Sequence, residues 1–220
     1  MTHGGSSPPG PDRPLILALP PPLPSRVFLA SPPTQTDDAA MAALFSSPHF
    51  LRHLPLLAET VSVEEMADRR QIEAGCKNVW AFRVHEAASG AFVGTAKLRR
   101  VPDFPGSCEV GIGIVHEMKG RGISEEVLFL LLDLAFKPFQ DAGLECSRVS
   151  FTTSVHNSPM CAILERWIGA THEGTLREAW ASVRDGSVSD VAIYAILRRE
   201  WREGGCRDRL LNRVKNRLDE

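Results

Sequence analysis

The chain lacks any pair of cysteines with the spacing of a zinc or redox motif. Its five cysteines are dispersed, and no Cys-x-x-Cys pair occurs among them. An odd and scattered set is typical of reduced thiols in an intracellular protein, and it argues against a disulfide framework or a zinc site. We therefore expect a cytoplasmic protein without a metal centre. The cysteines are Cys76, Cys108, Cys146, Cys161 and Cys206.

Long apolar runs and a strong net charge are also missing. No apolar run approaches the roughly 20 residues that a membrane-spanning helix needs. Residues 15–19 are apolar, but prolines enclose this short run and no basic region of the kind found in signal peptides precedes it. The formal net charge of -2 makes general binding to nucleic acids a poor hypothesis. We expect neither a membrane nor a nucleic acid as a partner.

The length of 220 residues fits one domain with tails. Residues 1–24 are rich in Gly, Ser and Pro, which predicts a disordered tail, and residues 25–203 form the expected folded domain. In residues 204–220 the apolar side chains follow a single helical stripe among basic residues. Such a helix can mark a membrane or nucleic-acid surface. We favour a helix that docks on its own domain or on a partner subunit, in a monomer or homodimer.

Hydrophobic periodicity predicts strands and helices that are mixed along the chain. Strands are expected at residues 26–29, 79–84, 91–98, 108–115, 148–153, 171–176 and 188–197. Helices are expected after Thr36 or Asp37, from Ser62 with a capping Glu65, over 125–136, from Asn157 to Trp167, and from Cys206.

A basic, glycine-rich loop at residues 119–124 lies between a predicted strand and the long apolar helix. A strand that leads through such a loop into a helix presents free backbone N–H groups and the positive helix end to an anion. The loop is no Walker A motif, because Gly-Lys-Ser/Thr is missing, and it lacks the full dinucleotide fingerprint. An anion site and an ordinary strand-to-helix turn are the two interpretations at this point.

The order of these elements resembles the GNAT superfamily of N-acetyltransferases, in the RimJ/RimL-like branch that includes ribosomal-protein N-terminal acetyltransferases. This family carries Arg/Gln-x-x-Gly-x-Gly/Ala after its fourth strand, where backbone N–H groups bind the pyrophosphate of coenzyme A. Here Lys takes the first position and Ser the last, and neither change removes a backbone donor. The matching residues are Lys119, Gly120, Arg121, Gly122, Ile123 and Ser124.

Further matches extend the resemblance to about residues 26–203. Asn157 fits the Asn that contacts the pantetheine arm and opens the next helix in this branch. Gly169-Ala170 resembles the end of that helix, with one extra residue before the glycine and Ala in place of Phe. Glu126 falls where the branch usually has Glu, and its carboxylate must point away from the phosphates.

The resemblance implies an α+β fold with α/β/α layers. Its mixed, mostly antiparallel central sheet is flanked by helices and contains a splayed strand pair that binds acyl-CoA. It also implies an enzyme that transfers acetyl from acetyl-CoA, its cosubstrate, to a primary amine by direct attack. Gly113, Ile114 and Val115 would lie along the cofactor, with glycine allowing a close approach. A backbone N–H near Val115 would polarise the thioester carbonyl.

Glu109 is the leading candidate for the catalytic base, because strand alternation places it on the face of Gly111 and Gly113. An exposed or ion-paired Glu109 is an equal alternative. An α-amino group needs only about 1 kcal/mol to deprotonate at neutral pH, and a lysine needs about 4.6 kcal/mol. An N-terminal acceptor could therefore manage with a weak base or a water. His116 and His156 flank the motifs, but histidines in such loops are more often structural.

The general acid is a gap in the resemblance. Many family members place a Tyr in the fourth helix to protonate the leaving thiolate, and Leu164 stands at that place here. The single tyrosine, Tyr194, falls in a late strand, so Ser158 or a water would have to serve. A non-catalytic acyl-CoA-binding or regulatory module is therefore the alternative function. No motif specifies whether the acceptor is a protein N-terminus or a small amine.

Overall fold

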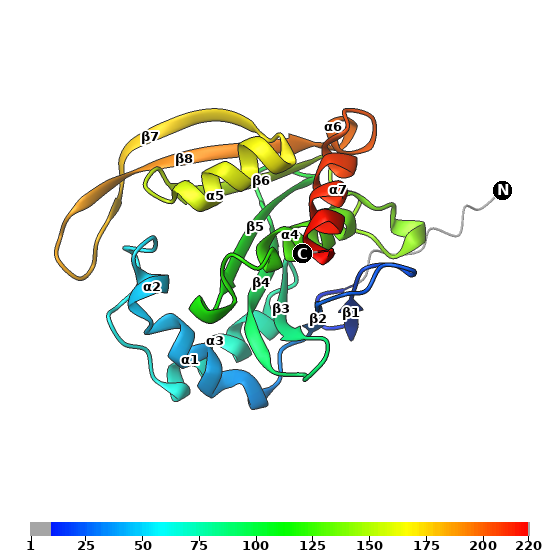
Figure 1. The fold of residues 1–220 in the computed structure, drawn as a ribbon. Coiled ribbons are helices and arrows are strands. Elements are labelled where there is room, and N and C mark those ends of the chain that lie inside the picture. Colours follow the sequence, from blue (N-terminus) through cyan, green and yellow to red (C-terminus); the bar gives the residue numbers. More distant parts are fainter. Residues whose placement is uncertain (1–9, 220) are drawn as a thin grey trace.

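The computed structural model describes residues 10–219. Its eight-stranded open sheet has the order β1-β2-β3-β4-β5-β6-β8-β7, and helices flank the sheet (Figure 1). This arrangement confirms the expected α+β fold. The strands are β1 (Leu15–Leu17), β2 (Val27–Ser31), β3 (Val79–Glu86), β4 (Phe92–Arg100), β5 (Ser107–Ile114), β6 (Arg148–Ser154), β7 (Thr171–Ala181) and β8 (Val188–Leu197).

Neighbouring strands run antiparallel except for β5 and β6, which are parallel. The pairing of β5 with β6 ends at Val110 and Phe151. Beyond that point β5 continues to Ile114 beside β4, and β6 continues to Ser154 beside β8. The two strands therefore splay apart. Beyond this point the backbone groups on their facing edges no longer form hydrogen bonds with the other strand.

The helix α4 (Ile123–Phe136) lies at the centre of the core. All its residues except Ser124 and Asp133 are buried, as expected for a helix that is almost entirely apolar from Val127 to Phe136. It contacts β2, β4, β5 and β6, while α7 (Cys206–Leu218) packs on it (Figure 1). The glycine loop leads directly into α4 and is thus anchored to a helix buried in the main core.

The remaining helices are shorter than α4. They are α1 (Asp38–Phe45), α2 (Pro48–Leu51), α3 (Val63–Gly75), α5 (Ser158–Ala162), the π-helix η4 (Ile163–Ile168) and α6 (Arg198–Arg202), with 3-10 turns η1 (Gln35–Asp37), η2 (His116–Met118) and η3 (Phe139–Asp141). The predicted capping box of Ser62 and Glu65 is present at the start of α3. No helix within residues 10–219 is long and apolar enough to cross a bilayer.

The ends of the chain differ in part from the expected boundaries. Residues 1–9 of the predicted tail lie outside the described residues. The tail is wrong for residues 15–19, because β1 pairs with β2 and Leu19 is buried in the main core. The apolar run enclosed by prolines forms an edge strand here, in which Leu15 and Leu17 are half-buried against the core and Ile16 is exposed. At the other end, Leu210 and Val214 are fully buried, so α7 docks on its own domain as favoured.

The π-helix η4 accounts for the extra residue before Gly169. A π-turn takes up one more residue than an α-turn and is typically a single local insertion. Gly169 follows with φ of 80°, a left-handed conformation that ends the helix at the predicted residue. The insertion is therefore absorbed within the helix, and the strand β7 starts in its expected place.

Candidate active site

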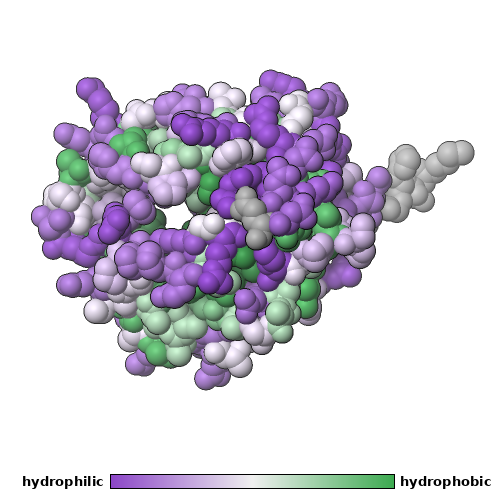
Figure 2. Space-filling model, in the orientation of Figure 1, coloured by the Kyte–Doolittle hydropathy of each residue, from purple (hydrophilic) through white to green (hydrophobic). Residues whose placement is uncertain are grey.

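A cavity of about 530 Å³ opens where β5 and β6 splay apart. Figure 2 shows a hollow in this face, at the position between α2, β5 and α5 in Figure 1. The cavity brings together most of the predicted cofactor residues: Gly113, Ile114, Lys119, Gly120, Gly122, Ile123, Ser124 and Asn157. Two other predicted cofactor residues, Val115 and Arg121, and the predicted base Glu109 are not among the described residues that line it.

The glycine loop has a backbone conformation that glycine adopts most readily. Gly120 and Gly122 have φ of 77° and 73°, in the left-handed region. Gly122 is the N-cap of α4, so the free N–H groups of the first turn follow it directly. A Cβ on Gly122 would lie 3.0 Å from Arg217 Cβ and 3.1 Å from Arg26 Nη2. Backbone conformation and crowding thus both require glycine there.

Arg26 and Glu126 hold the loop from its rear side. Glu126 is fully buried and accepts hydrogen bonds from the backbone N–H groups of Arg26 at 3.0 Å and Val27 at 3.3 Å. It also accepts one from Arg26 Nε at 3.2 Å. The Arg26 guanidinium donates to the carbonyl oxygens of Arg121 and Gly122. The loop carbonyls are therefore engaged behind the loop, and the carboxylate of Glu126 points away from the cavity as predicted.

The free N–H groups of β5 belong to Ile112 and Ile114, which corrects the expected donor Val115. The N–H of Val115 donates to the carbonyl of Val93 at 3.0 Å, on the side of β4. N–H groups alternate in direction along an antiparallel strand, so Ile112 and Ile114 direct theirs to the opposite edge. That edge is the one from which β6 has separated. Ile114 is thus the donor closest to the predicted place.

At the two β5 glycines that line the cavity, the place of a missing Cβ is taken by side chains of other elements. A Cβ on Gly113 would lie 2.4 Å from Cε2 of Phe50, which belongs to α2. A Cβ on Gly111 would lie 3.3 Å from the aliphatic chain of Lys97. The expected reason for glycine, a close approach by the cofactor, is therefore corrected at Gly113: the residue makes room for Phe50, which itself lines the cavity.

Glu109 lies in the paired part of β5, opposite Ser150 of β6. Its carboxylate forms an ion pair with Arg99 on the neighbouring strand. Glu109 therefore does not reach the cavity. It is an ion-paired strand residue, which was the alternative to a catalytic base. Strand alternation alone says which face a residue shares, but it does not say where the strands separate.

Asn157 lies where the end of β6 meets α5. It is the N-cap residue of α5, and its Nδ2 donates to Oγ1 of Thr153 at 3.0 Å. Both residues line the cavity. This hydrogen bond fixes the Asn157 amide at the splayed end of β6, where the resemblance to the family places it. The contact of Asn157 with the pantetheine arm stays a prediction.

The comparison with protein families agrees with this geometry. A family model described as "Acetyltransferase (GNAT) domain" matches residues 26–170, which is more than half of the chain. The chain belongs to the GNAT acetyltransferase family. This assignment confirms the N-acetyltransferase class, for which the acyl donor is an acyl-CoA and the acceptor an amine.

A curated relative supports the RimJ/RimL-like branch within the GNAT family, and two solved structures share the fold. The chain is 28% identical over 152 residues to the Bacillus subtilis protein named "Putative ribosomal N-acetyltransferase YdaF", covering 69% of this chain and 77% of that protein. Mycobacterium smegmatis RimJ in complex with CoA-disulfide superposes with a TM-score of 0.70 at 22% identity, covering 85% and 88% of the chains. A spermidine N-acetyltransferase SpeG chimera from Vibrio cholerae and hSSAT gives 0.67 at 21% identity, covering 81% and 99%.

Two histidines that the sequence did not indicate as site residues also line the cavity. They are His49 in α2 and His53 just after it. Nδ1 of His53 is buried and has no hydrogen-bond partner among residues 10–219. Burial, and after it the positive charges of Lys119 and Arg52, lower the pKa of His53 from 6.5. His53 is therefore neutral at pH 7 and able to accept a proton. No local sequence signal marks it, because only the fold carries α2 to the splayed strands.

A tyrosine acid is missing from the cavity as far as the described residues extend. Leu164 is fully buried at the place where the family often has Tyr. Tyr194 donates to Oε1 of Glu165 at 2.7 Å, and burial raises the pKa of its phenol. Ser158 is exposed and is not one of the described residues that line the cavity. The leaving thiolate therefore needs a different proton source.

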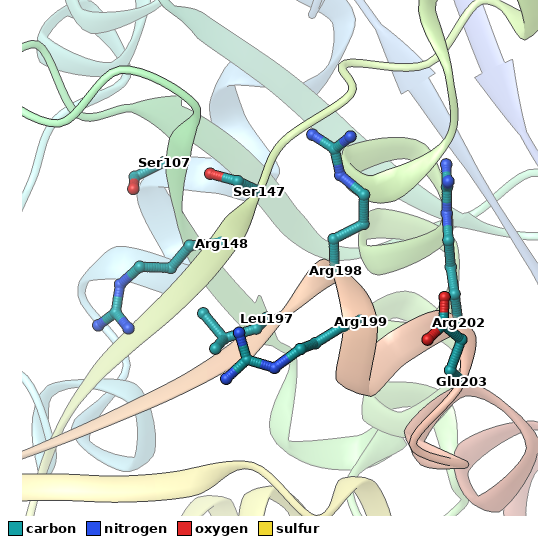
Figure 3. Close-up of a pocket in the computed structure, with 8 residues that line it drawn as sticks. All are labelled: Ser107, Ser147, Arg148, Leu197, Arg198, Arg199, Arg202 and Glu203. Carbon is teal, nitrogen blue, oxygen red and sulfur yellow. The ribbon is translucent and has the colours of Figure 1, made fainter.

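A second pocket, of about 500 Å³, lies at the other end of β5 and β6 (Figure 3). Several arginines line it, but most of them stabilise the fold. Arg148 pairs with Glu173, Arg198 donates to the carbonyl of Cys146 at 2.7 Å, and Arg202 donates to the carbonyl of Phe136 at 2.9 Å. The guanidinium groups that line this pocket are thus largely engaged in contacts within the protein. The splayed end of β5 and β6 remains the candidate active site.

Proposed function

We propose that the protein is an acetyl-CoA-dependent N-acetyltransferase whose acceptor is the α-amine of a polypeptide chain end. The observation that carries the proposal is the single cavity in which the splayed end of β5, the glycine loop and a neutral histidine meet. Acetyl-CoA would supply an activated thioester carbonyl. The protein has to hold the cofactor, polarise this carbonyl and remove a proton from the amine.

The residues present fit the cofactor. The left-handed glycines expose the N–H groups that open α4, a suitable site for a pyrophosphate. The unpaired edge of β5 offers Ile112 and Ile114 N–H groups to a pantetheine chain lying in the gap that β6 leaves. We assign the polarising donor to the N–H of Ile114, since such preorganised donors stabilise charge that develops on a carbonyl oxygen.

The acceptor side of the cavity favours a narrow, singly charged amine. Arg184, in the turn between β7 and β8, donates to the carbonyls of Leu51 at 3.0 Å, Leu54 at 3.2 Å and Leu57 at 2.7 Å. This ties the turn to the end of α2 and to the segment after it, and Leu54 in that segment and Trp180 near the end of β7 both line the cavity. We infer that a chain end fits between them better than a broad surface does.

The charges of the cavity argue against a polyamine acceptor. Within residues 10–219, Glu125 is the one carboxylate that lines the cavity, and it pairs with Arg213 at 3.6 Å. Near α2 the walls are instead aromatic or apolar, with Phe50, Leu54 and Trp180. A polycation would find no counter-charge there, whereas a peptide with an apolar first residue would fit.

His53 is the group we assign to proton removal. An α-amine releases its proton at a cost of about 1 kcal/mol at neutral pH, so a weak base suffices. His53 lines the cavity, its Nδ1 is not engaged by another described residue, and its lowered pKa keeps it neutral.

Replacing His53 by Gln should lower kcat at pH 7 by about 100-fold and change the pH profile. Because the pKa of His53 is lowered, the neutral base is present above this pKa and is lost as pH falls through it. The rate of the unchanged protein should therefore fall on that acidic limb, and the limb should be missing in His53→Gln. The exposed His49 supplies the control, since His49→Gln should keep the limb. An unchanged pH–rate profile in His53→Gln would show that His53 is not the catalytic base.

The proposal is tested by thiol release from acetyl-CoA with three acceptors, after calorimetry has shown cofactor binding. The acceptors are a peptide with a free α-amine, the same peptide with a blocked N-terminus and one lysine, and spermidine. We expect turnover of the free α-amine at least about 10-fold faster than of either other amine, given the higher cost of deprotonating lysine. Equal or faster turnover of spermidine would contradict the acceptor class. Binding without turnover of any amine would leave a non-catalytic acyl-CoA-binding module.

A further inference from the structure

We propose that the C-terminal helix α7 is part of the cofactor site, with Arg213 and Arg217 binding the phosphates of coenzyme A. This rests on the proposed function, and it adds a binding element that lies beyond residues 26–170, where the chain matches the family model. The two arginines are four positions apart, so they lie one above the other on one face of α7. Both line the cavity beside Gly120 and Gly122.

The helix is fixed in this place by its own apolar stripe. Cys206, Leu210 and Val214 are buried in the main core, and α7 contacts α4 and η4. The arginine face is thereby directed to the start of α4, where the anion site lies. A helix that served only to cover the core would not need two cations on the face toward the glycine loop.

Arg213 is held in position before any ligand arrives. Its guanidinium lies 4.2 Å from the ring centroid of Trp167, and its Nε lies 3.6 Å from Oε1 of Glu125. Trp167 belongs to the π-helix η4 and also lines the cavity. A stacked, partly buried guanidinium loses little freedom when it binds a phosphate, and its planar fork suits the phosphate oxygens.

Arg217 joins α7 to the glycine loop. Its Cβ and Cγ lie 3.0 Å from the place that a Cβ on Gly122 would take. Its carbonyl oxygen accepts a hydrogen bond at 3.1 Å from Nη1 of Arg26, while Nη2 of Arg26 donates to the carbonyl of Gly122 at 3.2 Å. One guanidinium, that of Arg26, thus fixes the loop and the last turn of α7 relative to each other.

The charges fit a ligand with several phosphates. Lys119, Arg213 and Arg217 line the cavity, against the single carboxylate of Glu125 within residues 10–219. Burial and the nearby Arg52 lower the pKa of Lys119, as expected for a cation in a partly desolvated, positive site. This excess of positive charge destabilises the empty cavity. A pyrophosphate together with a 3′-phosphate would neutralise the charge.

The test compares coenzyme A with pantetheine, which has the same thiol arm and no phosphate. Dissociation constants are measured by calorimetry for coenzyme A and by NMR titration for pantetheine, in the full chain and in Arg213→Gln and Arg217→Gln. Each substitution should weaken coenzyme A binding by about 10- to 100-fold, the range for a hydrogen bond to a charged group. Binding of pantetheine should change less than about 2-fold, which also shows that the variants are folded. The exposed Lys215, on the same helix, supplies the control Lys215→Gln with less than about 2-fold change for both ligands.

The outcomes separate this inference from the proposed function. Coenzyme A binding that is unaffected by both substitutions, or weakened as much as pantetheine binding, would overturn the role of α7 alone. If the unchanged protein bound no coenzyme A, the proposed function would fail, and the role of α7 with it. A large effect of Lys215→Gln would show that total charge, and not the arginine face, is responsible.

Discussion

Replacing Gly120 by Asp is expected to weaken coenzyme A binding by at least about 100-fold. Gly120 has φ of 77° and nothing within 4 Å of an added Cβ, so a side chain there enters open space at the cavity wall. Asp tolerates the left-handed conformation better than most residues, so the fold should be retained. Its carboxylate would stand at the anion site. A like charge about 4 Å from a phosphate costs roughly 4 kcal/mol at an effective dielectric constant of 20, more than enough for this loss.

The β3–β4 turn offers a matched control for this substitution. Gly90 has φ of 72° and likewise nothing within 4 Å of an added Cβ. It is not among the described residues that line the cavity. Gly90→Asp adds the same charge to the same backbone conformation and should leave the dissociation constant within about 2-fold. The dissociation constants of coenzyme A are measured by calorimetry. Equal values for Gly120→Asp and the wild-type protein would show that the glycine loop does not bind the cofactor.

Replacing Arg26 by Met should lower the free energy of unfolding by about 3–5 kcal/mol at pH 7. Glu126 would stay fully buried after losing its cationic partner, and an uncompensated buried charge is costly in this range. The carbonyls of Arg121 and Gly122 would lose their donor as well. Urea denaturation measures the stability, and coenzyme A titration should show weaker binding because the loop is no longer fixed.

The pH dependence of this loss identifies Glu126 as its cause. Burial already raises the pKa of Glu126 above 4.5, and removing Arg26 should raise it further. A carboxyl group with a raised folded-state pKa contributes stability that is present below its unfolded pKa and is lost as pH rises through its folded pKa. The difference between Arg26→Met and the unchanged protein should therefore be large at pH 7 and shrink toward pH 4.5.

The exposed ion pair of Arg99 and Glu109 supplies the comparison for Arg26. Arg99 is 45% exposed, and such pairs contribute about 0–1 kcal/mol. Arg99→Met should therefore cost at most about 1 kcal/mol, with little dependence on pH. Similar losses in both variants would contradict the special role of the buried pair.

Local patterns predicted the parts of the site that lie close together in the sequence. The glycine loop, the N-terminus of α4 and the apolar length of that helix are all encoded within residues 119–136. The capping box of Ser62 and Glu65 is a similar case, since both partners lie within one helical turn. For such elements the physical cause and the sequence signal coincide.

The remaining parts depend on contacts between distant segments. Arg26 meets Glu126 across 100 positions, and α7 reaches the loop from the far end of the chain. The N–H of Val115 faces β4 and not the gap, because the β4–β5 register decides which N–H groups face the gap. Glu109 was misplaced because the point at which β5 and β6 separate is a property of the whole sheet. The edge strand β1 was missed because its stability comes from β2 and not from its own composition.

The central claim is that the splayed end of β5 and β6 holds acetyl-CoA with its thioester next to the acceptor side of the cavity, near α2. A crystal structure of the protein with coenzyme A and a peptide bearing a free α-amine tests it most directly. We expect the pyrophosphate on the N–H groups of residues 120–124, beside Arg213 and Arg217. We expect the pantetheine arm along Ile112 and Ile114 and the α-amine near His53. Coenzyme A bound elsewhere, such as in the arginine-lined pocket of Figure 3, would contradict the claim.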